Sequence, residues 1–434
     1  MGLKNTVLSI FLIFFSFTII AQNKIEAEKI INRRCATNEY MLRRQSIDTA
    51  WISKRKEIED FSQNYIKNNT DKLNKKEIIT IPVVVHIIYK YVSQNVTDER
   101  VLEQIGVLNR DYMGLNTHSM GAFADSLKTN TQLQFCLAKR TPSGAWTSGI
   151  ERRTGSDVPP TFYVNDDMKY YSLGGLDQWD PNKYMNIWVC DIYNSGTSGF
   201  AEFPTKPLYD TYGVVISPQF FGITGATPPY DLGATTTHEI GHCFNLYHIW
   251  GDDDGDCGGT IHPGSDLCSD TPDQSDANFD PHTGAIMDAC SPNYPGIMYM
   301  NFMDYTHDKC LANFTPKQKL RIQACFATNG VLAALKNSNA CTPVAVDENQ
   351  PIIECNIYPN PSDGNVNLNI NLNQTDNISI ITYNMIGDII AEKIILNADN
   401  VDITLDLTAY PAGIYFVKIQ SDSQSITKKL SLIK

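Results

Sequence analysis

The sequence predicts two folded units, a larger α/β domain and, after a linker, a small all-β sandwich. The first prediction rests on β-branched runs that alternate with helical patterns between residues 78 and 336, as is typical of an α/β layer. The second rests on short strand patterns with closely spaced turn signals between residues 357 and 434. A chain of 434 residues with 42% hydrophobic residues is long and apolar enough for two or three globular units.

The N-terminus has the features of a secretory signal peptide, residues 1–21. Lys4 precedes a short apolar run from Val7 to Ile20, and the small residue Ala21 closes that run. The run is shorter than the roughly 20 residues that a membrane-spanning helix needs, which favours a signal peptide over a membrane anchor. No second apolar run of this length follows, so we expect no stable transmembrane segment in the mature protein.

Residues 22–77 are predicted to form a pro-segment. The stretch is rich in Lys, Arg, Glu and Asn and has little apolar periodicity, so we expect it to be solvated rather than part of a core. Its basic clusters, such as Arg43-Arg44 and Lys75-Lys76, are candidate processing sites, although charged runs are also typical of ordinary surfaces.

Hydrophobic periodicity predicts the elements of the α/β domain. The continuous run IITIPVVVHIIY from Ile78 indicates a buried strand. Thr97 is predicted to cap a helix whose apolar side chains, from Val101 to Tyr112, fall on one face. Further strands are expected at Gln132–Lys139, Tyr184–Ile192 and Tyr212–Ser217, with a short one at Gly199–Phe203.

Net charge and cysteine content limit the classes of function that the chain can have. A formal net charge of −13 leaves no basic surplus to neutralise phosphates, so a nucleic-acid partner is excluded. Eleven cysteines in an exported chain imply disulfides, and the odd number leaves at least one thiol unpaired or used otherwise.

The segment HEIGHCFNLYH at residues 238–248 predicts a catalytic zinc site. His238 and His242 are four residues apart, so on a helix both imidazoles project from one face. Glu239 lies beside the first of them, where its carboxylate can act as general base. His248 completes the site after a turn, and three histidines with one open position are typical of catalytic rather than structural zinc.

Alternatives to this interpretation are a buried histidine pair or a helix N-terminus. Thr236 and Glu239 match a capping box, which would fold the Glu239 carboxylate back onto the backbone. Asp231, followed by Gly233, is a better candidate for the helix start. Asn245 stands where the extended motif HExxHxxGxxH has glycine, and because Asn tolerates a left-handed backbone, we expect the turn to be kept.

Several motifs together resemble the pappalysin family of metzincins, particularly its cytophagalysin and ulilysin branch. The resemblance runs from about Ile78 to Phe326. The segments that carry it are HEIGHCFNLYHIWGD, IPVVVHIIY, the DTP of Asp270–Pro272 and NFMDYTHDKC at 301–310.

The resemblance implies a zinc metalloendopeptidase acting on protein or peptide substrates. Its catalytic domain, residues 78–336, would have the α/β metzincin (zincin-like) fold, with a twisted mixed sheet and a zinc-binding helix. It further implies that Met303 forms a methionine turn beneath the zinc and that Tyr305 helps to stabilise the oxyanion.

The resemblance also includes a latency cysteine, which Cys35 would supply. A thiolate held over the metal would displace the catalytic water, whereas the alternative is an incidental thiol. By resemblance Cys257 pairs with Cys290 and Cys268 with Cys310, although four cysteines allow three pairings. Cys243, within the zinc helix, is expected to be a small buried residue.

Specificity and calcium are further implications. By resemblance Asp308 lies in the pocket for the residue after the scissile bond and predicts cleavage before Arg or Lys; the alternative is an exposed surface Asp. Calcium is expected in the acidic loop 252–273, with Asp266, Thr271 and the carbonyl of Ser269 as ligands, against the alternative of a solvated acidic loop.

Residues 337–356 are polar and lack periodicity, as a linker does, and residues 357–434 resemble the sorting domain of the type IX secretion system of Bacteroidetes. The motifs are YPNPSDGNVNL, AGIYFVKI and ITKKLSLIK. This implies export across the outer membrane by that machinery, to the cell surface or the medium. A carbohydrate-binding sandwich is the alternative, disfavoured because few aromatic residues are available for a sugar platform.

A surface binding module with a structural or inactive zinc site is the rival function for the whole chain. The intact Glu239 and the open three-histidine site count against it.

Overall fold

The computed structural model describes residues 34–70, 77–192, 197–251, 257, 266–343, 353–385, 387–421 and 425–433. The chain divides into two units, residues 1–343 and 344–434. The predicted signal peptide lies outside the described residues, as does much of the predicted linker. Among the described residues, no helix combines the length and apolar character needed to cross a bilayer.

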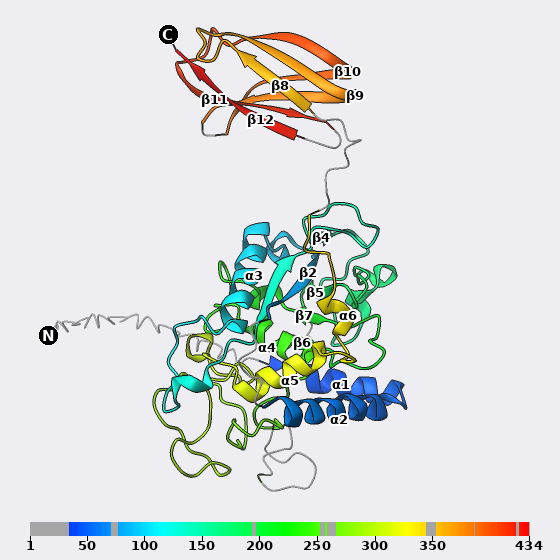
Figure 1. Ribbon diagram of the computed structural model, residues 1–434, viewed down its shortest axis with the longest axis vertical. Helices are drawn as coiled ribbons and strands as arrows, with labels where there is room; N and C mark the ends of the chain where they lie inside the picture. Colours follow the sequence, from blue (N-terminus) through cyan, green and yellow to red (C-terminus); the bar gives the residue numbers. More distant parts are fainter. Residues whose placement is uncertain are drawn as a thin grey trace, which may run out of the picture. The chain divides into compact units, whose positions relative to one another are not determined.

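The larger unit is built on a seven-stranded mixed sheet, which confirms the predicted α/β layer (Figure 1). Neighbouring strands run parallel except β6, which is antiparallel to β7. The strand order is β1 (Arg34–Cys35), β6 (Thr197–Ala201), β7 (Val214–Ile216), β5 (Met185–Val189), β2 (Ile79–Ile88) and β3 (Leu133–Leu137), with β4 (Ile150–Arg153) also paired to β2. Nearly every residue of β2 is buried, because the strand is covered on both faces, as its continuous apolar run predicts.

Two helices pack on one face of this sheet and share its largest apolar core. In α3 (Asp98–Tyr112) the hydroxyl of Thr97 accepts a hydrogen bond from the amide of Arg100, so the predicted cap is present. The apolar stripe of α3 faces the core together with Ile240 of α4 (Ala234–Cys243). Helices α5 (Pro316–Phe326) and α6 (Ala333–Lys336) follow later in the chain of this unit.

Residues 34–70, here called the N-terminal segment, pack tightly against the rest of the larger unit. After β1 they form α1 (Thr37–Ile47) and α2 (Trp51–Asn69), and α2 lies along α5 (Figure 1). Tyr40 is fully buried, and Arg44 and Arg55 are also buried. The expectation of a solvated segment is therefore wrong for these residues, because their arginines are enclosed by partners on the larger unit rather than by water.

Two disulfides are present among the described residues. Cys257 is bonded to Cys290, the pair that the family resemblance implies. Cys136 of β3 is bonded to Cys341, 205 residues away, a pair that spacing alone did not indicate.

The second implied bond, Cys268–Cys310, is not formed. Both residues are free thiols with different surroundings. The backbone amide of Cys268 donates to Asp266, whereas the thiol of Cys310 lies 3.9 Å from the carbonyl of His282. Cys243 is a buried free thiol, as predicted.

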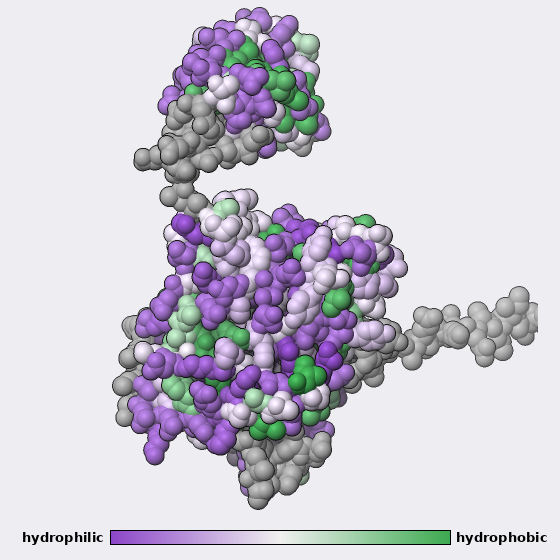
Figure 2. Space-filling view, turned by 90° about the vertical axis from the view of Figure 1, so that its right-hand side faces the viewer, coloured by the Kyte–Doolittle hydropathy of each residue, from purple (hydrophilic) through white to green (hydrophobic). Residues whose placement is uncertain are grey.

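The smaller unit is an antiparallel five-stranded sheet that folds around one apolar core. The long strand β9 pairs with β8, β10 and β11, so the sheet nearly closes on itself. The strands are β8 (Ile353–Tyr358), β9 (Asn365–Tyr383), β10 (Ile389–Asp406), β11 (Gly413–Gln420) and β12 (Ser425–Leu432). The predicted all-β unit is thus confirmed. On the face drawn in Figure 2, hydrophilic residues dominate the larger unit and hydrophobic ones are scattered in small groups.

Candidate metal centre

Three buried histidines from α4 and the turn after it converge on one point. The helix carries His238 and His242, and the chain then turns so that His248 faces them. Asn245, in that turn, has a φ of 69°, a left-handed conformation that suits Asn or Gly. The three Nε2 atoms lie 3.1 to 3.2 Å from one another. Tetrahedral zinc with Zn–N bonds of about 2.0–2.1 Å needs nitrogens roughly 3.3 Å apart, so the donor set fits zinc.

The other ring nitrogens hold two of these histidines in the ligand tautomer. His238 Nδ1 donates to the carbonyl of Phe302 at 2.7 Å, and His242 Nδ1 donates to that of Leu246 at 2.8 Å. A carbonyl can only accept, so the Nε2 lone pairs point toward the shared centre. Burial lowers the pKa of His242 well below its usual value, and the neighbouring His248 adds a smaller lowering effect. The low pKa favours the neutral imidazole that binds a metal.

Glu239 points into the same centre. Its Oε2 accepts a hydrogen bond from the Thr37 hydroxyl at 3.0 Å and lies 3.3 Å from the Cys35 thiol. The helix begins at Ala234 with Gly233 as its N-cap, so the capping-box alternative is wrong, and the start lies beyond Asp231. The Glu239 carboxylate is therefore at the centre and not folded back on the backbone.

Cys35 reaches the centre from the N-terminal segment. Its sulfur is 3.5 Å from His242 Nε2, and the four ligand atoms of Cys35 and the three histidines lie within 4.8 Å of one another. Burial raises the pKa of this thiol well above its usual value, and the negative charge of Glu239 adds a smaller raising effect. A cation at the centre would reverse that effect and favour the thiolate.

Strand pairing positions Cys35. β1 lies parallel to β6, with Cys35 opposite Gly199, and the Ala36 amide donates to the Gly199 carbonyl at 2.9 Å. A Cβ on Gly199 would lie 2.8 Å from the Val215 carbonyl and 3.0 Å from Glu239 Cγ. Glycine is therefore needed for the edge of the sheet to approach the centre this closely.

Residues 303–305 and Trp250 enclose the histidines. Met303 packs under α4, since a Cβ on Gly241 would lie 2.6 Å from its sulfur. The Tyr305 hydroxyl lies 3.1 Å from His248 Nε2 and 3.4 Å from the Cys35 carbonyl. Trp250 stacks on the His248 ring, with centroids 4.3 Å apart.

Asp308 is only 1% exposed, so the alternative of an exposed surface Asp is wrong. Its Oδ2 accepts the amides of Leu232 at 2.9 Å and Ala234 at 3.2 Å, at the N-terminus of α4. A carboxylate is favourable there because of the helix dipole.

Asp266 and Thr271, two of the expected calcium ligands, are in contact. Asp266 Oδ1 accepts the Thr271 hydroxyl at 2.6 Å and the Cys268 amide at 3.0 Å. Burial raises the pKa of Asp266 to about 6. Ser269 lies exposed between them, whereas residues 252–256 and 258–265 of this loop lie outside the described part of the chain.

The turn between His242 and His248 is tied to α2. Arg55 Nη2 donates to Asn245 Oδ1 at 2.6 Å, and Asn245 Nδ2 donates to Ser62 Oγ at 3.2 Å. Arg321 of α5 donates to the Asn245 carbonyl and forms a two-pronged ion pair with Glu59 of α2. Sequence reasoning missed these contacts, as well as Thr37 and Trp250. The proximity of Thr37 to Cys35 was the one usable signal.

Comparison with known proteins agrees with this geometry. A family model described as Pregnancy-associated plasma protein-A matches residues 175–327, and one described as Secretion system C-terminal sorting domain matches 356–434. An extracellular metalloprotease of Arthroderma benhamiae is 30% identical over 253 residues, 56% of this chain and 71% of that protein. One from Pyricularia oryzae is 27% identical over 263 residues, 58% of this chain and 77% of that protein.

The chain is also similar to solved structures of mirolysin and promirolysin. Tannerella forsythia mature mirolysin in complex with a cleaved peptide is 39% identical, with a TM-score of 0.57, over 61% of this chain and 97% of that one. A promirolysin mutant from Tannerella forsythia is 37% identical, with a TM-score of 0.55, over 63% of this chain and 90% of that one.

Proposed function

The chain belongs to the pappalysin family of zinc metalloproteases and ends in a type IX secretion sorting domain, and from this we propose that it is exported as a latent zymogen whose Cys35 blocks the zinc site. The observation that carries the proposal is the meeting of the Cys35 thiol and the Glu239 carboxylate at the three-histidine centre. A thiol that reaches that place from the N-terminal segment suits a removable fourth ligand of the metal.

The residues of the centre divide the chemistry among them. His238, His242 and His248 hold the zinc, which when bound polarises the scissile carbonyl and lowers the pKa of water toward about 7. Glu239 takes the proton from the attacking water and delivers it to the leaving amine. The Tyr305 hydroxyl donates a hydrogen bond to the developing oxyanion. Met303 supports α4 from below.

Latency follows from two occupied positions. Cys35 takes the place of the water, and the Thr37 hydroxyl occupies Glu239 Oε2 at 3.0 Å. β1 also covers the outer edge of β6, where an extended substrate would add as a strand once the segment is removed.

Export and maturation complete the proposal. The signal peptide, residues 1–21, would direct passage through the inner membrane, and the secretion machinery would recognise residues 357–434 after the linker 337–356. The pro-segment 22–77 would then be cut from the catalytic domain, residues 78–336. Calcium held by Asp266, Thr271 and the Ser269 carbonyl would stabilise the loop around them.

A cleavage-site profile tests the function. Secreted protein, activated by limited trypsin, is incubated with a proteome-derived peptide library, with and without a zinc chelator. Cleavage that the chelator abolishes and added zinc restores is the expected result. A folded protein with one bound zinc and no cleavage of any peptide would instead support the binding-module alternative.

Asp308→Asn is expected to weaken a preference for Arg or Lys directly after the scissile bond by about tenfold to a hundredfold in kcat/KM. A charge-assisted hydrogen bond to the substrate would be lost, while the amide oxygen still accepts from the N-terminus of α4. Paired peptides with Arg or citrulline at that position measure the ratio. The matched control is Asp231→Asn, which removes a charge at the same end of α4. A ratio that Asp308→Asn leaves intact would remove Asp308 from specificity.

The cut zymogen is expected to release its N-terminal segment more readily in acid. Burial alone would raise the pKa of Glu59, but the Arg321 guanidinium outweighs it and holds this pKa at about 2. Attachment that depends on the ionised carboxylate is complete above the ordinary pKa of 4.5 and is lost as pH falls toward 2. The dissociation constant should therefore rise about tenfold between pH 6 and pH 3.5.

Size-exclusion chromatography of the cut zymogen at each pH measures this release. In Glu59→Gln the tenfold contribution should vanish, leaving only the pH dependence of other carboxylates that pair with the segment, such as Asp166 and Glu202, which both contact Arg44. An unchanged pH profile in Glu59→Gln would contradict the role given to the Glu59–Arg321 ion pair.

A further inference from the structure

We propose that Glu202 and Asp166 form a second specificity subsite, which binds an arginine or lysine side chain of the substrate once the N-terminal segment has left. This inference rests on the proposed function and deepens it, because it adds a selective position besides that of Asp308. The subsite takes a residue two to four positions from the scissile bond.

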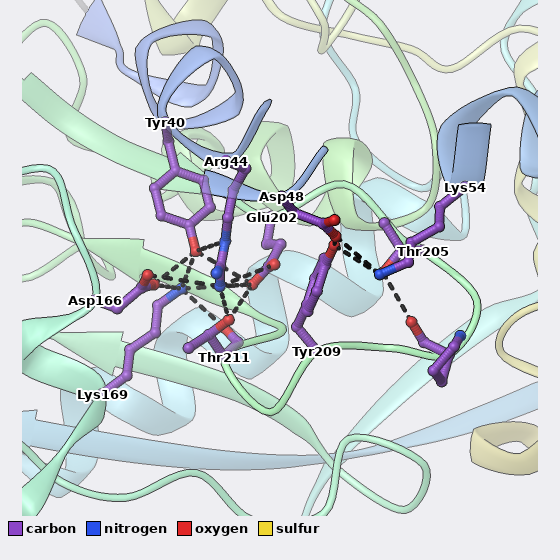
Figure 3. A network of polar contacts seen from close by, with 11 residues as sticks. Tyr40, Arg44, Asp48, Lys54, Asp166, Lys169, Glu202, Thr205, Tyr209 and Thr211 are labelled. Carbon is purple, nitrogen blue, oxygen red and sulfur yellow. Dashed lines mark hydrogen bonds and ion pairs between the residues drawn. The ribbon is translucent and has the colours of Figure 1, made fainter. Parts of the chain in front are cut away.

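The pocket already holds a guanidinium in the zymogen, that of Arg44 from α1 (Figure 3). Arg44 Nη2 lies 3.1 Å from Glu202 Oε1 and 3.5 Å from Asp166 Oδ2. The same group lies over the ring of Tyr209, with 4.8 Å between the guanidinium carbon and the ring centroid. Two carboxylates and one aromatic face are the surroundings that a guanidinium prefers.

Without the N-terminal segment, the described residues do not neutralise this pocket. The one buried cation that remains there among them, Lys169, lies 3.3 Å from Asp166 Oδ1 and 3.8 Å from Glu202 Oε2. Two carboxylates face one ammonium, so the departure of Arg44 leaves one negative charge without a counterion. Such a charge in an enclosed site is costly, and a cationic substrate group removes the cost.

One carboxylate oxygen points at the vacated space. Glu202 has a side chain only 2% exposed, and Oε2 accepts the Thr211 hydroxyl at 2.8 Å. Within the described part of the chain, Oε1 accepts no hydrogen bond, and its close contact is the ion pair with Arg44. This oxygen is therefore an acceptor that Arg44 contacts in the zymogen and that an incoming cation could take over.

The pocket lies within reach of a substrate strand on β6. Glu202 directly follows β6, three residues after Gly199, which pairs with Cys35 at the centre. Three extended residues span about 10 Å, and side chains alternate between the two faces of a sheet. Cys35 faces the histidines, whereas Ala36 packs in the apolar cluster of Phe200, on the Glu202 side. Alternate substrate side chains would likewise point toward Glu202, and a long basic one fills the distance.

The test uses the processed enzyme. The library profile should show Arg or Lys enriched at one position two to four residues from the cut. Peptide pairs with Arg or neutral citrulline at that position then give a ratio of kcat/KM. Glu202→Gln and Asp166→Asn should each lower this ratio about tenfold to a hundredfold while the citrulline peptide is still cleaved, because only a charge-assisted contact is lost.

Asp210→Asn, at an exposed position next to Tyr209, is the matched control and should keep the wild-type ratio. Two variants are used because Glu202 is the more deeply buried, and thermal unfolding confirms that each is folded. Zinc-dependent cleavage without a basic preference at these positions, or a ratio unchanged in both variants, would overturn the subsite and leave the proposed function standing. Absence of any zinc-dependent cleavage would overturn the proposed function, and the subsite with it.

Discussion

Glu239→Gln is expected to lower kcat of the processed enzyme by about 10²- to 10⁴-fold, the usual contribution of a positioned general base. The side chain is fully buried, and its Oε2 lies beside Cys35 and Thr37, where the attacking water would stand in the active enzyme. Gln keeps the shape and can still hydrogen-bond, but it cannot accept the proton. KM should change little, because substrate contacts along β6 are untouched.

Zinc content and peptide hydrolysis are measured on the same preparation. The variant should bind one zinc per molecule, like the wild type, since Glu239 is proposed as a base and not as a ligand. Glu99→Gln, an exposed position on α3, is the matched control and should keep full activity. Near-normal kcat in zinc-loaded Glu239→Gln would assign the base to another residue.

Cys35→Ser is expected to raise the peptidase activity of the uncut zymogen by at least about tenfold. Weakening the contact between residue 35 and the metal by about 1.4 kcal/mol is enough to give that factor. A serine hydroxyl is a much weaker zinc ligand than a thiolate, so the fourth position would open to water. The ion pairs of Arg44 and Glu59 would still hold the segment, so activation should be partial.

Hydrolysis of a short fluorogenic peptide before and after trypsin treatment measures this effect. After processing, Cys35→Ser and wild type should be equally active, because the cysteine leaves with the segment. Cys310→Ser, which changes a part-buried thiol beside the His282 carbonyl, should stay as silent as the wild-type zymogen. A silent Cys35→Ser zymogen that still binds zinc would mean that α1 and α2 alone block access.

Sequence patterns predicted correctly those features that depend on residues close together in the chain. The apolar run of β2, the Thr97 cap of α3 and the histidine spacing on α4 each depend on residues within one or two turns or one strand. These were therefore accessible from the sequence without knowledge of the fold.

Long-range partners were not accessible in this way. From the sequence, Arg44 and Arg55 were expected to be solvated, because nothing near them in the chain shows that Arg44 contacts Glu202 and that Arg55 contacts Asn245. The β1–β6 pairing that places Cys35 joins strands more than 160 residues apart. Burial of a charge depends on the three-dimensional neighbours, and only the folded structure supplies them.

The Cys136–Cys341 bond has a consequence for an enzyme that works among other copies of itself. A cut in any loop between these two cysteines divides the chain but leaves both pieces covalently attached. All three histidines, Glu239 and Tyr305 lie within that span. A nicked molecule therefore keeps every part of its centre on one tethered body, and damage to its surface loops does not scatter the catalytic machinery.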